Sequence, residues 1–177
     1  MAPPDVQARI IDAVRAACSA IGLYHGPVHA ECRVESGGDA RVYILEIAAR
    51  PVGGLCSRAL RFGGTRSLED ILLRHALGEN VSSYVREAAA SGVMMIPIPR
   101  RGVYRRVEGI EAAGQVAGVE DIRITAKPDT MLVPLPEGRS YLGFIFARAV
   151  RPEDVDRALR EAHARLEFIV EREVAVL

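Results

Sequence analysis

Apolar residues recur every three or four positions in two segments of the chain, which is the spacing of an amphipathic helix. The first segment covers residues 4–21 and is followed by Gly22, a helix stop. The second begins after Ser67, a residue type that caps helix N-termini, and continues to Gly78. Glu69 and Asp70 place negative charge in its first turn, where the helix dipole favours it. We therefore expect one helix in each segment.

Two strand-like segments, residues 28–35 and 42–48, lie between these helices and flank the sequence Ser-Gly-Gly-Asp at 36–39. Paired glycines favour a type I′ hairpin turn, because both central residues of that turn have positive φ. The return segment is apolar apart from Glu46, which predicts a strand buried on both faces. A carboxylate inside such a strand marks the hairpin as a candidate site.

A polar stretch at residues 79–91 predicts a boundary between two units, and we place it between residues 88 and 89. Beyond it, strand-like and helix-like segments alternate: strands at 93–98, 119–126 and 141–150, helices at 107–116 and 152–167. This alternation is typical of one sheet covered by helices on one side. The expected fold class is α+β, with units at residues 1–88 and 89–177.

Composition and charge narrow the kinds of partner. Apolar residues make up 49% of the chain, enough for a core, and 23 basic residues balance 23 acidic ones. We expect neither nucleic acid nor a membrane as partner. Three cysteines without paired spacing predict no disulfide framework, and the first residues hold no apolar signal segment, so a cytoplasmic location is expected. The arginine cluster at 100–106 is either a solvated face or an anion-binding one.

The hairpin turn predicts which residues face one another. If Gly37 and Gly38 are the two turn residues, each residue i pairs with residue 75 minus i. His29 then faces Glu46, and Glu31 is a diagonal neighbour of Glu46 on the same sheet face, with Cα atoms about 7–8 Å apart. Two carboxylates at that separation can converge on one or two hard cations.

The residues after the second glutamate extend this hypothesis. Mg²⁺ is commonly held by one or two carboxylates together with nucleotide phosphates. If the strand continues, Arg50 points to the same side as Glu46 and can bind a phosphoryl oxygen. Gly53 and Gly54 allow backbone N–H groups to approach an anion, and His29 is expected to support Glu46 by a hydrogen bond. The alternative is a structural salt bridge at a strand end.

The sequence resembles the closing part of the ATP-grasp catalytic domain, which is usually written with Glu on one strand and Glu-x-Asn-x-Arg on the next. The matching phrases are Gly-Pro-Val-His-Ala-Glu at 26–31 and Leu-Glu-Ile-Ala-Ala-Arg-Pro-Val-Gly-Gly at 45–54. Residues 67–78 are similar to the helix that follows this site. The C-terminal domain of L-amino acid ligases is similar to four further segments, which begin at Gly92, Val107, Pro134 and Tyr141.

This resemblance implies a function. Residues 1–88 correspond to the C-terminal subdomain of the ATP-grasp catalytic domain, and residues 89–177 to the small α+β C-terminal domain of the L-amino acid ligase type. Glu31 and Glu46 are implied to hold Mg²⁺ or Mn²⁺ bridging the phosphates of ATP, and Arg50 to steady a phosphate or acyl phosphate. The implied enzyme is an ATP-dependent carboxylate–amine or carboxylate–thiol ligase that acts through an acyl-phosphate intermediate.

Two departures from the family pattern set further expectations. Ala48 replaces the usual asparagine, which removes one oxygen ligand. No glycine-rich phosphate lid precedes residue 26, and Lys127, the single lysine, is expected to be a surface loop residue. We therefore expect the isolated chain to be inactive, to need the missing ATP-grasp lobes in cis or in trans, and to self-associate. The alternative is a non-catalytic, stand-alone interaction or oligomerisation module derived from this fold.

Overall fold

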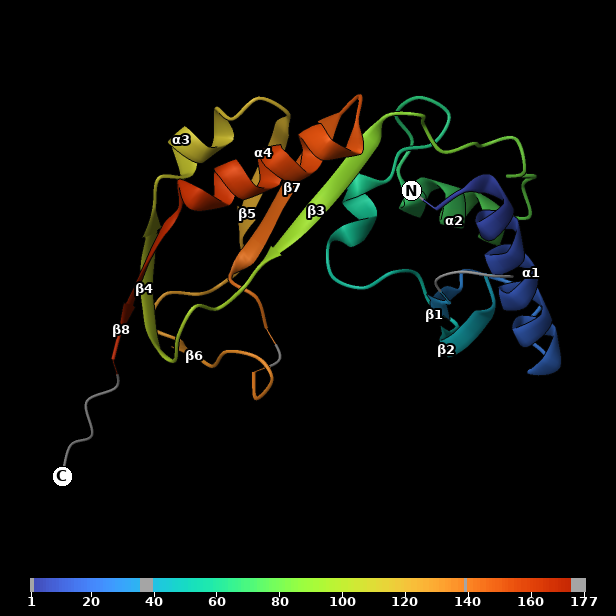
Figure 1. Cartoon of the computed structure of the whole chain (residues 1–177), viewed down its shortest axis with the longest axis horizontal. Helices are drawn as coiled ribbons and strands as arrows, with labels where there is room; N and C mark the ends of the chain where they lie inside the picture. The colour runs from blue at the N-terminus through green and yellow to red at the C-terminus, as the bar shows by residue number, and fades with distance from the viewer. Residues whose placement is uncertain (1, 36–39, 139, 173–177) are drawn as a thin grey trace. The chain divides into compact units, whose positions relative to one another are not determined.

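The structure, a computed structural model, describes residues 2–35, 40–138 and 140–172 (Figure 1). The chain folds into two compact units, Met1–Glu87 and Ala88–Leu177, called here unit 1 and unit 2. All strand pairs are antiparallel and helices accompany the sheets in both units. The predicted α+β class is confirmed.

Unit 1 combines two helices, a short 3-10 helix and one hairpin. Its elements are α1 (Pro4–Ala20), β1 (His29–Val34), β2 (Val42–Ala48), η1 (Cys56–Ala59) and α2 (Leu68–Ala76). The Ser67 hydroxyl accepts a hydrogen bond from the Asp70 backbone N–H at 3.2 Å, as expected of an N-cap residue. The predicted turn at residues 36–39 lies outside the described residues.

The prediction that the return strand is buried on both faces is wrong. Helix α1 packs against β2, but burial alternates from Val42 to Leu45, and Tyr43 and Leu45 are 47% and 63% exposed. Helix α1 therefore covers one face of the hairpin, and the face that carries Tyr43 is exposed. Among the described residues of unit 1, Ser57 and Ala59 are the fully buried ones.

Unit 2 contains two three-stranded sheets, so the single predicted sheet is also wrong. Their strand orders are β3-β7-β5 and β6-β4-β8. The elements are β3 (Ala90–Ile96), β4 (Gly102–Glu108), α3 (Ile110–Gly114), β5 (Val119–Ile124), β6 (Met131–Leu132), β7 (Gly143–Ala149), α4 (Pro152–Ala164) and β8 (Glu167–Glu171). Strands β4 and β8 occupy segments that the sequence assigned to a cluster of charges and to the ends of helices.

The core of unit 2 lies between the sheet β3-β7-β5 and the helices α3 and α4, which lie on the same side of it (Figure 1). Helix α4 buries Val155, Ala158, Leu159 and Ala162, an i, i+3, i+4, i+7 set that forms one face. Gly92 on β3 allows close packing, because a Cβ there would lie 2.8 Å from Val155 Cγ1. The core extends to the second sheet through Tyr104, Leu132 and Val170. Its other buried members are Ile96, Ile98, Ala113, Val116, Leu142, Ile145 and Ala147.

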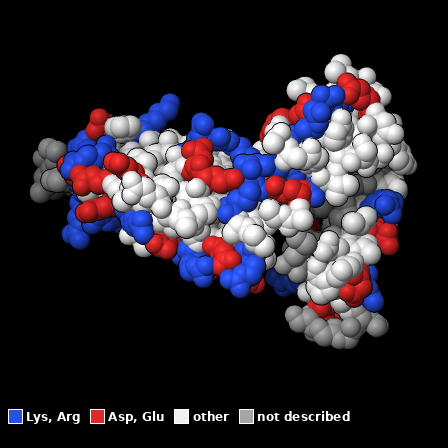
Figure 2. All heavy atoms as spheres, turned by 90° about the horizontal axis from the view of Figure 1, so that it is seen from above, with Lys and Arg blue, Asp and Glu red and all other residues white. Residues whose placement is uncertain are grey.

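Figure 2 shows charged side chains of both signs intermixed on one face. Ion pairs of unit 2 include Arg148 with Glu120 at 3.0 Å and Arg151 with Asp154 at 2.9 Å. Of the arginine cluster at 100–106, Arg105 contacts Glu171 at 2.7 Å, Arg106 contacts Glu108 at 2.8 Å, and Arg100 donates to the Val170 carbonyl. The described helices include none with the length and apolar character to cross a membrane.

Candidate functional site

The two glutamates of the hairpin are direct cross-strand partners. Antiparallel pairing of β1 with β2 places Glu31 opposite Glu46, and the flanking pair is His29 with Ala48. Directly opposed residues have Cβ atoms about 4.5–5.5 Å apart. The two carboxylates therefore start from neighbouring positions on one face of the hairpin.

The predicted register is wrong by two residues at this point. It set Glu31 against Ile44 and His29 against Glu46, whereas the structure sets Glu31 against Glu46 and His29 against Ala48. Two shifts of one residue add up to this difference. Cys32 pairs with Ile44, already one position from its predicted partner, and a β-bulge between Glu31 and Cys32 adds the second shift, with Leu45 as the extra residue of β2. Together the two shifts change the predicted diagonal relationship into a direct one.

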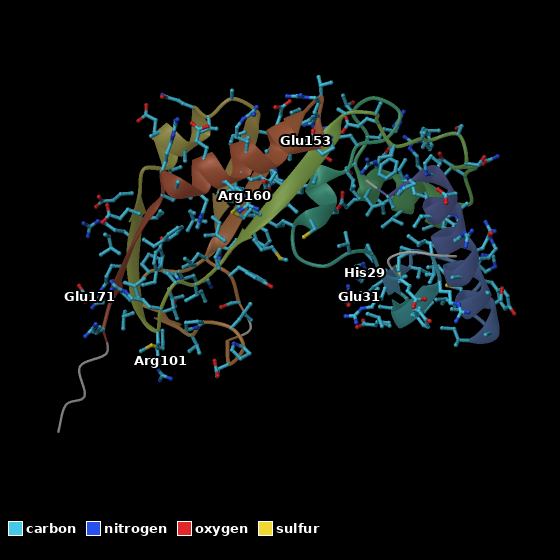
Figure 3. The ribbon with its side chains drawn as sticks, viewed as in Figure 1. His29, Glu31, Arg101, Glu153, Arg160 and Glu171 are labelled. Carbon is cyan, nitrogen blue, oxygen red and sulfur yellow. The ribbon has the colours of Figure 1, made fainter. Side chains whose placement is uncertain are left out.

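His29 supports Glu31, not Glu46 as predicted. The two residues are two positions apart on β1, so their side chains lie on the same face (Figure 3). The imidazole Nε2 lies 3.7 Å from Glu31 Oε1, and the side chain of His29 is 28% exposed against 58% for Glu31.

Arg50 does not continue the strand. Strand β2 ends at Ala48, and the Arg50 N–H donates to the Ala48 carbonyl at 2.9 Å, which turns the chain before Pro51. The guanidinium donates to the Pro51 carbonyl at 3.1 Å. Within the described residues no ion pair joins Arg50 to Glu31 or Glu46, so the structure does not bring the arginine and the carboxylates together.

Arg50 lies instead beside the glycine pair that follows it. A Cβ on Gly53 would lie 3.6 Å from Arg50 Nη1, so the guanidinium borders the backbone of this loop. Gly54 has φ of 64°, a conformation that residues with a Cβ rarely adopt. The loop thus presents a cation and adjacent backbone amides at the end of the hairpin.

A connection between this loop and α2 has no signal in the sequence. Ser57 on η1 is buried, and its hydrogen bond to the Glu69 carboxylate is the largest cause of a lowered Glu69 pKa. The backbone N–H of Glu69, the Ser67 hydroxyl and the charge of Arg58 lower this pKa further, while burial raises it. These contacts fix the segment after Gly53 and Gly54 to the start of α2.

The protein donors at the hairpin are few. No cluster of three or more histidine, cysteine, aspartate or glutamate side chains suited to a metal occurs among residues 2–35, 40–138 and 140–172. Ala48, at the position of the usual family asparagine, lies opposite His29 and supplies no oxygen. Two opposed carboxylates offer hard oxygen ligands, which suit Mg²⁺ or Mn²⁺ when phosphates and water complete the shell.

Comparison with known proteins identifies unit 2. Residues 94–171 match the family model of the L-amino acid ligase C-terminal domain 2. This segment is similar to that family. Together with the solved structures below, it confirms the resemblance to the C-terminal part of ATP-grasp ligases.

Solved structures of ligases share the fold of this chain. L-amino acid ligase from Bacillus licheniformis is 24% identical with a TM-score of 0.79, covering 97% of this chain and 43% of that one. Phosphoribosylglycinamide synthetase from Anaerococcus prevotii is 16% identical with a TM-score of 0.75, covering 96% and 43%. N5-carboxyaminoimidazole ribonucleotide synthetase from Thermotoga maritima is 15% identical with a TM-score of 0.67, covering 96% and 44%.

A curated sequence also matches most of the chain. The uncharacterized protein y4rH of Sinorhizobium fredii is 22% identical over 162 residues, which cover 92% of this chain and 33% of that protein. The chain therefore spans about a third of the length of this relative and less than half of the length of the three ligases.

Proposed function

We propose that this chain supplies the metal-binding wall of the nucleotide site in an ATP-dependent carboxylate–amine or carboxylate–thiol ligase. The direct pairing of Glu31 with Glu46 is the observation that carries this proposal. The matches to three ligases support it, since one of them is an L-amino acid ligase.

Each residue of the hairpin has a role in the proposed site. Glu31 and Glu46 hold Mg²⁺ or Mn²⁺, and His29 orients Glu31. A bound divalent cation supplies charge neutralisation at phosphate oxygens. Arg50, with the amides near Gly53 and Gly54, binds oxygens of the transferred phosphate or of the acyl phosphate.

The proposed reaction has two steps. A substrate carboxylate oxygen attacks the γ-phosphorus of ATP, ADP leaves, and an acyl phosphate forms. An amine or thiol then attacks the acyl carbon, and inorganic phosphate leaves with the former carboxylate oxygen. Such chemistry depends on positioning and charge stabilisation, which the carboxylate pair and Arg50 supply from this side of the site. We propose that the remaining ATP-grasp lobes act in cis or in trans.

Metal binding by the full chain tests the carboxylate pair. Mn²⁺ is added with and without ATP, and broadening of backbone amide NMR signals is followed. We expect broadening centred on Glu31 and Glu46, and tighter Mn²⁺ binding when ATP is present.

Glu46→Gln should weaken Mn²⁺ binding about tenfold or more. Glu35→Gln is the matched control, because Glu35 is exposed and follows β1 on the same hairpin. Broadening that is unchanged in Glu46→Gln contradicts the proposal.

Ala48 favours a second candidate, a non-catalytic interaction module with the same fold. Such a module needs no nucleotide, so Mg²⁺ with ATP should not raise its thermal unfolding midpoint. A midpoint that rises with ligand concentration, and rises less in Glu46→Gln, decides for the ligase site.

A further inference from the structure

A hollow in unit 2 combines a cation, hydroxyl groups and an apolar floor. It has a volume of about 400 Å³ and lies between the turn at residues 125–131 and the segment that leads into β7. Its polar lining comes from Thr125, Lys127, Thr130, Ser140 and Tyr141. It shares no residue with the hairpin of unit 1.

Lys127 differs from the basic residues around it. It is the single lysine of the chain, and within the described residues its ammonium makes no ion pair and no hydrogen bond. The nearest acid in sequence, Asp129, pairs with Arg105, which also binds Glu171. Because Arg105 occupies the carboxylate, the charge of Lys127 remains available to an external anion.

The turn that carries Lys127 is held in place by backbone hydrogen bonds. The N–H groups of Thr125 and Ala126 both donate to the Leu142 carbonyl at 3.0 Å, and the Asp129 N–H donates to the Tyr104 carbonyl at 2.8 Å. The Thr130 hydroxyl donates to the Lys127 carbonyl at 2.6 Å. Little ordering is therefore left for a ligand to impose on the backbone, which lowers the entropic cost of binding.

The floor of the hollow is apolar. Leu132 and Phe144 are 4% and 7% exposed, and they line it together with Met131. An ammonium beside several hydroxyls suits the oxygens of a carboxylate or phosphate, while the floor suits a non-polar body. A hydrated inorganic ion alone leaves that floor in contact with water.

We propose that this hollow binds a small organic anion, with a carboxylate or phosphate group at Lys127 and an apolar or aromatic body over Leu132 and Phe144. The site goes beyond the proposed metal site of unit 1 and does not depend on it. One exposed cation and a few hydroxyls set the expected dissociation constant at about 1–10 mM.

The single lysine provides a direct probe. Reductive methylation with ¹³C-formaldehyde labels Lys127 and the N-terminal amine and keeps their charge, so the full chain yields one side-chain lysine signal. Phenyl phosphate and phenylacetate are titrated in separate arms, with inorganic phosphate and acetate as partners that lack the body. We expect a saturable shift of the Lys127 signal, tighter for the aromatic probes, and no saturation at the N-terminal amine. The tighter aromatic probe identifies the anionic group.

Variants connect the shift to the hollow. Thr125→Val should weaken binding about threefold or more, the scale of one neutral hydrogen bond. Thr65→Val is the matched control, since Thr65 lies in unit 1 and is exposed. Lys127→Gln has no lysine signal, so binding to it is followed by the backbone amide NMR signals of Thr130 and Ser140. The probes should shift these amide signals in the wild-type chain and leave them unshifted in Lys127→Gln. Linear shifts for all four probes, or equal binding by Lys127→Gln, overturn the proposal. Loss of metal binding at Glu46 leaves this result unchanged, so the two proposals fail separately.

Discussion

Units 1 and 2 are similar in length, residues 1–87 and 88–177, but they differ in how they bury apolar side chains. Unit 2 encloses a continuous core with fully buried Ile96, Leu142 and Ile145. Among the described residues, unit 1 exposes eight large apolar side chains and unit 2 exposes five; those of unit 1 are Ile11, Ile21, Tyr24, Tyr43, Leu45, Leu73, Leu77 and Val85. The difference separates a unit with a continuous core from a unit that exposes more of its large apolar side chains.

This contrast matters because the proposed chemistry lies entirely in unit 1. Glu31 and Glu46 sit on the exposed face of the hairpin, next to Tyr43 and Leu45 in the same strand pair. Large exposed apolar patches mark protein interaction surfaces, and Tyr43 and Leu45 are neighbouring exposed apolar residues on this face. We therefore propose that another protein surface covers the exposed hairpin face of unit 1, and that unit 2 requires no such partner surface.

The largest expected effect is a core truncation in unit 2. Ile145 is 0% exposed at the centre of β7, between β3 and β5. Ile145→Ala should lower the free energy of unfolding by about 2–5 kcal/mol, because it removes buried methyl groups and leaves a cavity. Leu45→Ala, at a 63% exposed position in unit 1, should change it by less than about 0.5 kcal/mol. Urea unfolding followed by circular dichroism measures both variants, and equal losses would remove the distinction between the units.

A smaller effect is expected in self-association. If two copies of the chain cover the open hairpin face, Leu45→Asn should raise the dissociation constant about tenfold, equivalent to about 1.4 kcal/mol of lost apolar burial. Val150→Asn is the matched control, because Val150 is 89% exposed in unit 2 and lies outside the hairpin. Sedimentation velocity over a range of concentrations separates the two. A wild-type chain that stays monomeric throughout contradicts this proposal.

The sequence predicted the helices of unit 1 and its hairpin because each has a local signal. Ser67, Gly22 and Gly78 mark helix ends, and apolar spacing gives the helix face. Strands β4 and β8 of unit 2 lacked such signals. In β4 the consecutive residues Arg105 and Arg106 obscure the alternation, and a bulge between Tyr104 and Arg106 shifts the pairing with β8.

The candidate site shows the same limit at the level of single residues. The shared hairpin face of Glu31 and Glu46 was predicted, but the register behind it was not, because two shifts of one residue each restore the predicted parity. One shift is already present where Cys32 pairs with Ile44. The other is the bulge between Glu31 and Cys32, which contains no glycine or proline to indicate it. The position of Arg50 could not be predicted either, since the chain turns at Ala49 by a hydrogen bond from Arg50 to Ala48.

The smallest expected effect concerns pH and the buried serine of unit 1. The Ser57 hydrogen bond holds the pKa of Glu69 below its ordinary value of 4.5. A carboxyl with a lowered folded-state pKa stabilises the fold above the unfolded-state pKa, and this contribution is lost as pH falls through the folded-state pKa.

Ser57→Ala removes the largest cause of the lowered pKa, so the pKa of Glu69 should rise toward 4.5. Carboxyl ¹³C NMR measures this pKa. When the pH is lowered from about 6 to about 3.5, the thermal unfolding midpoint should fall less in Ser57→Ala than in the wild-type chain. Ser83→Ala, at an exposed position of unit 1, should leave both quantities unchanged. If Ser57→Ala behaves like Ser83→Ala, the buried contact between η1 and α2 does not stabilise unit 1, and its contrast with the core of unit 2 becomes sharper.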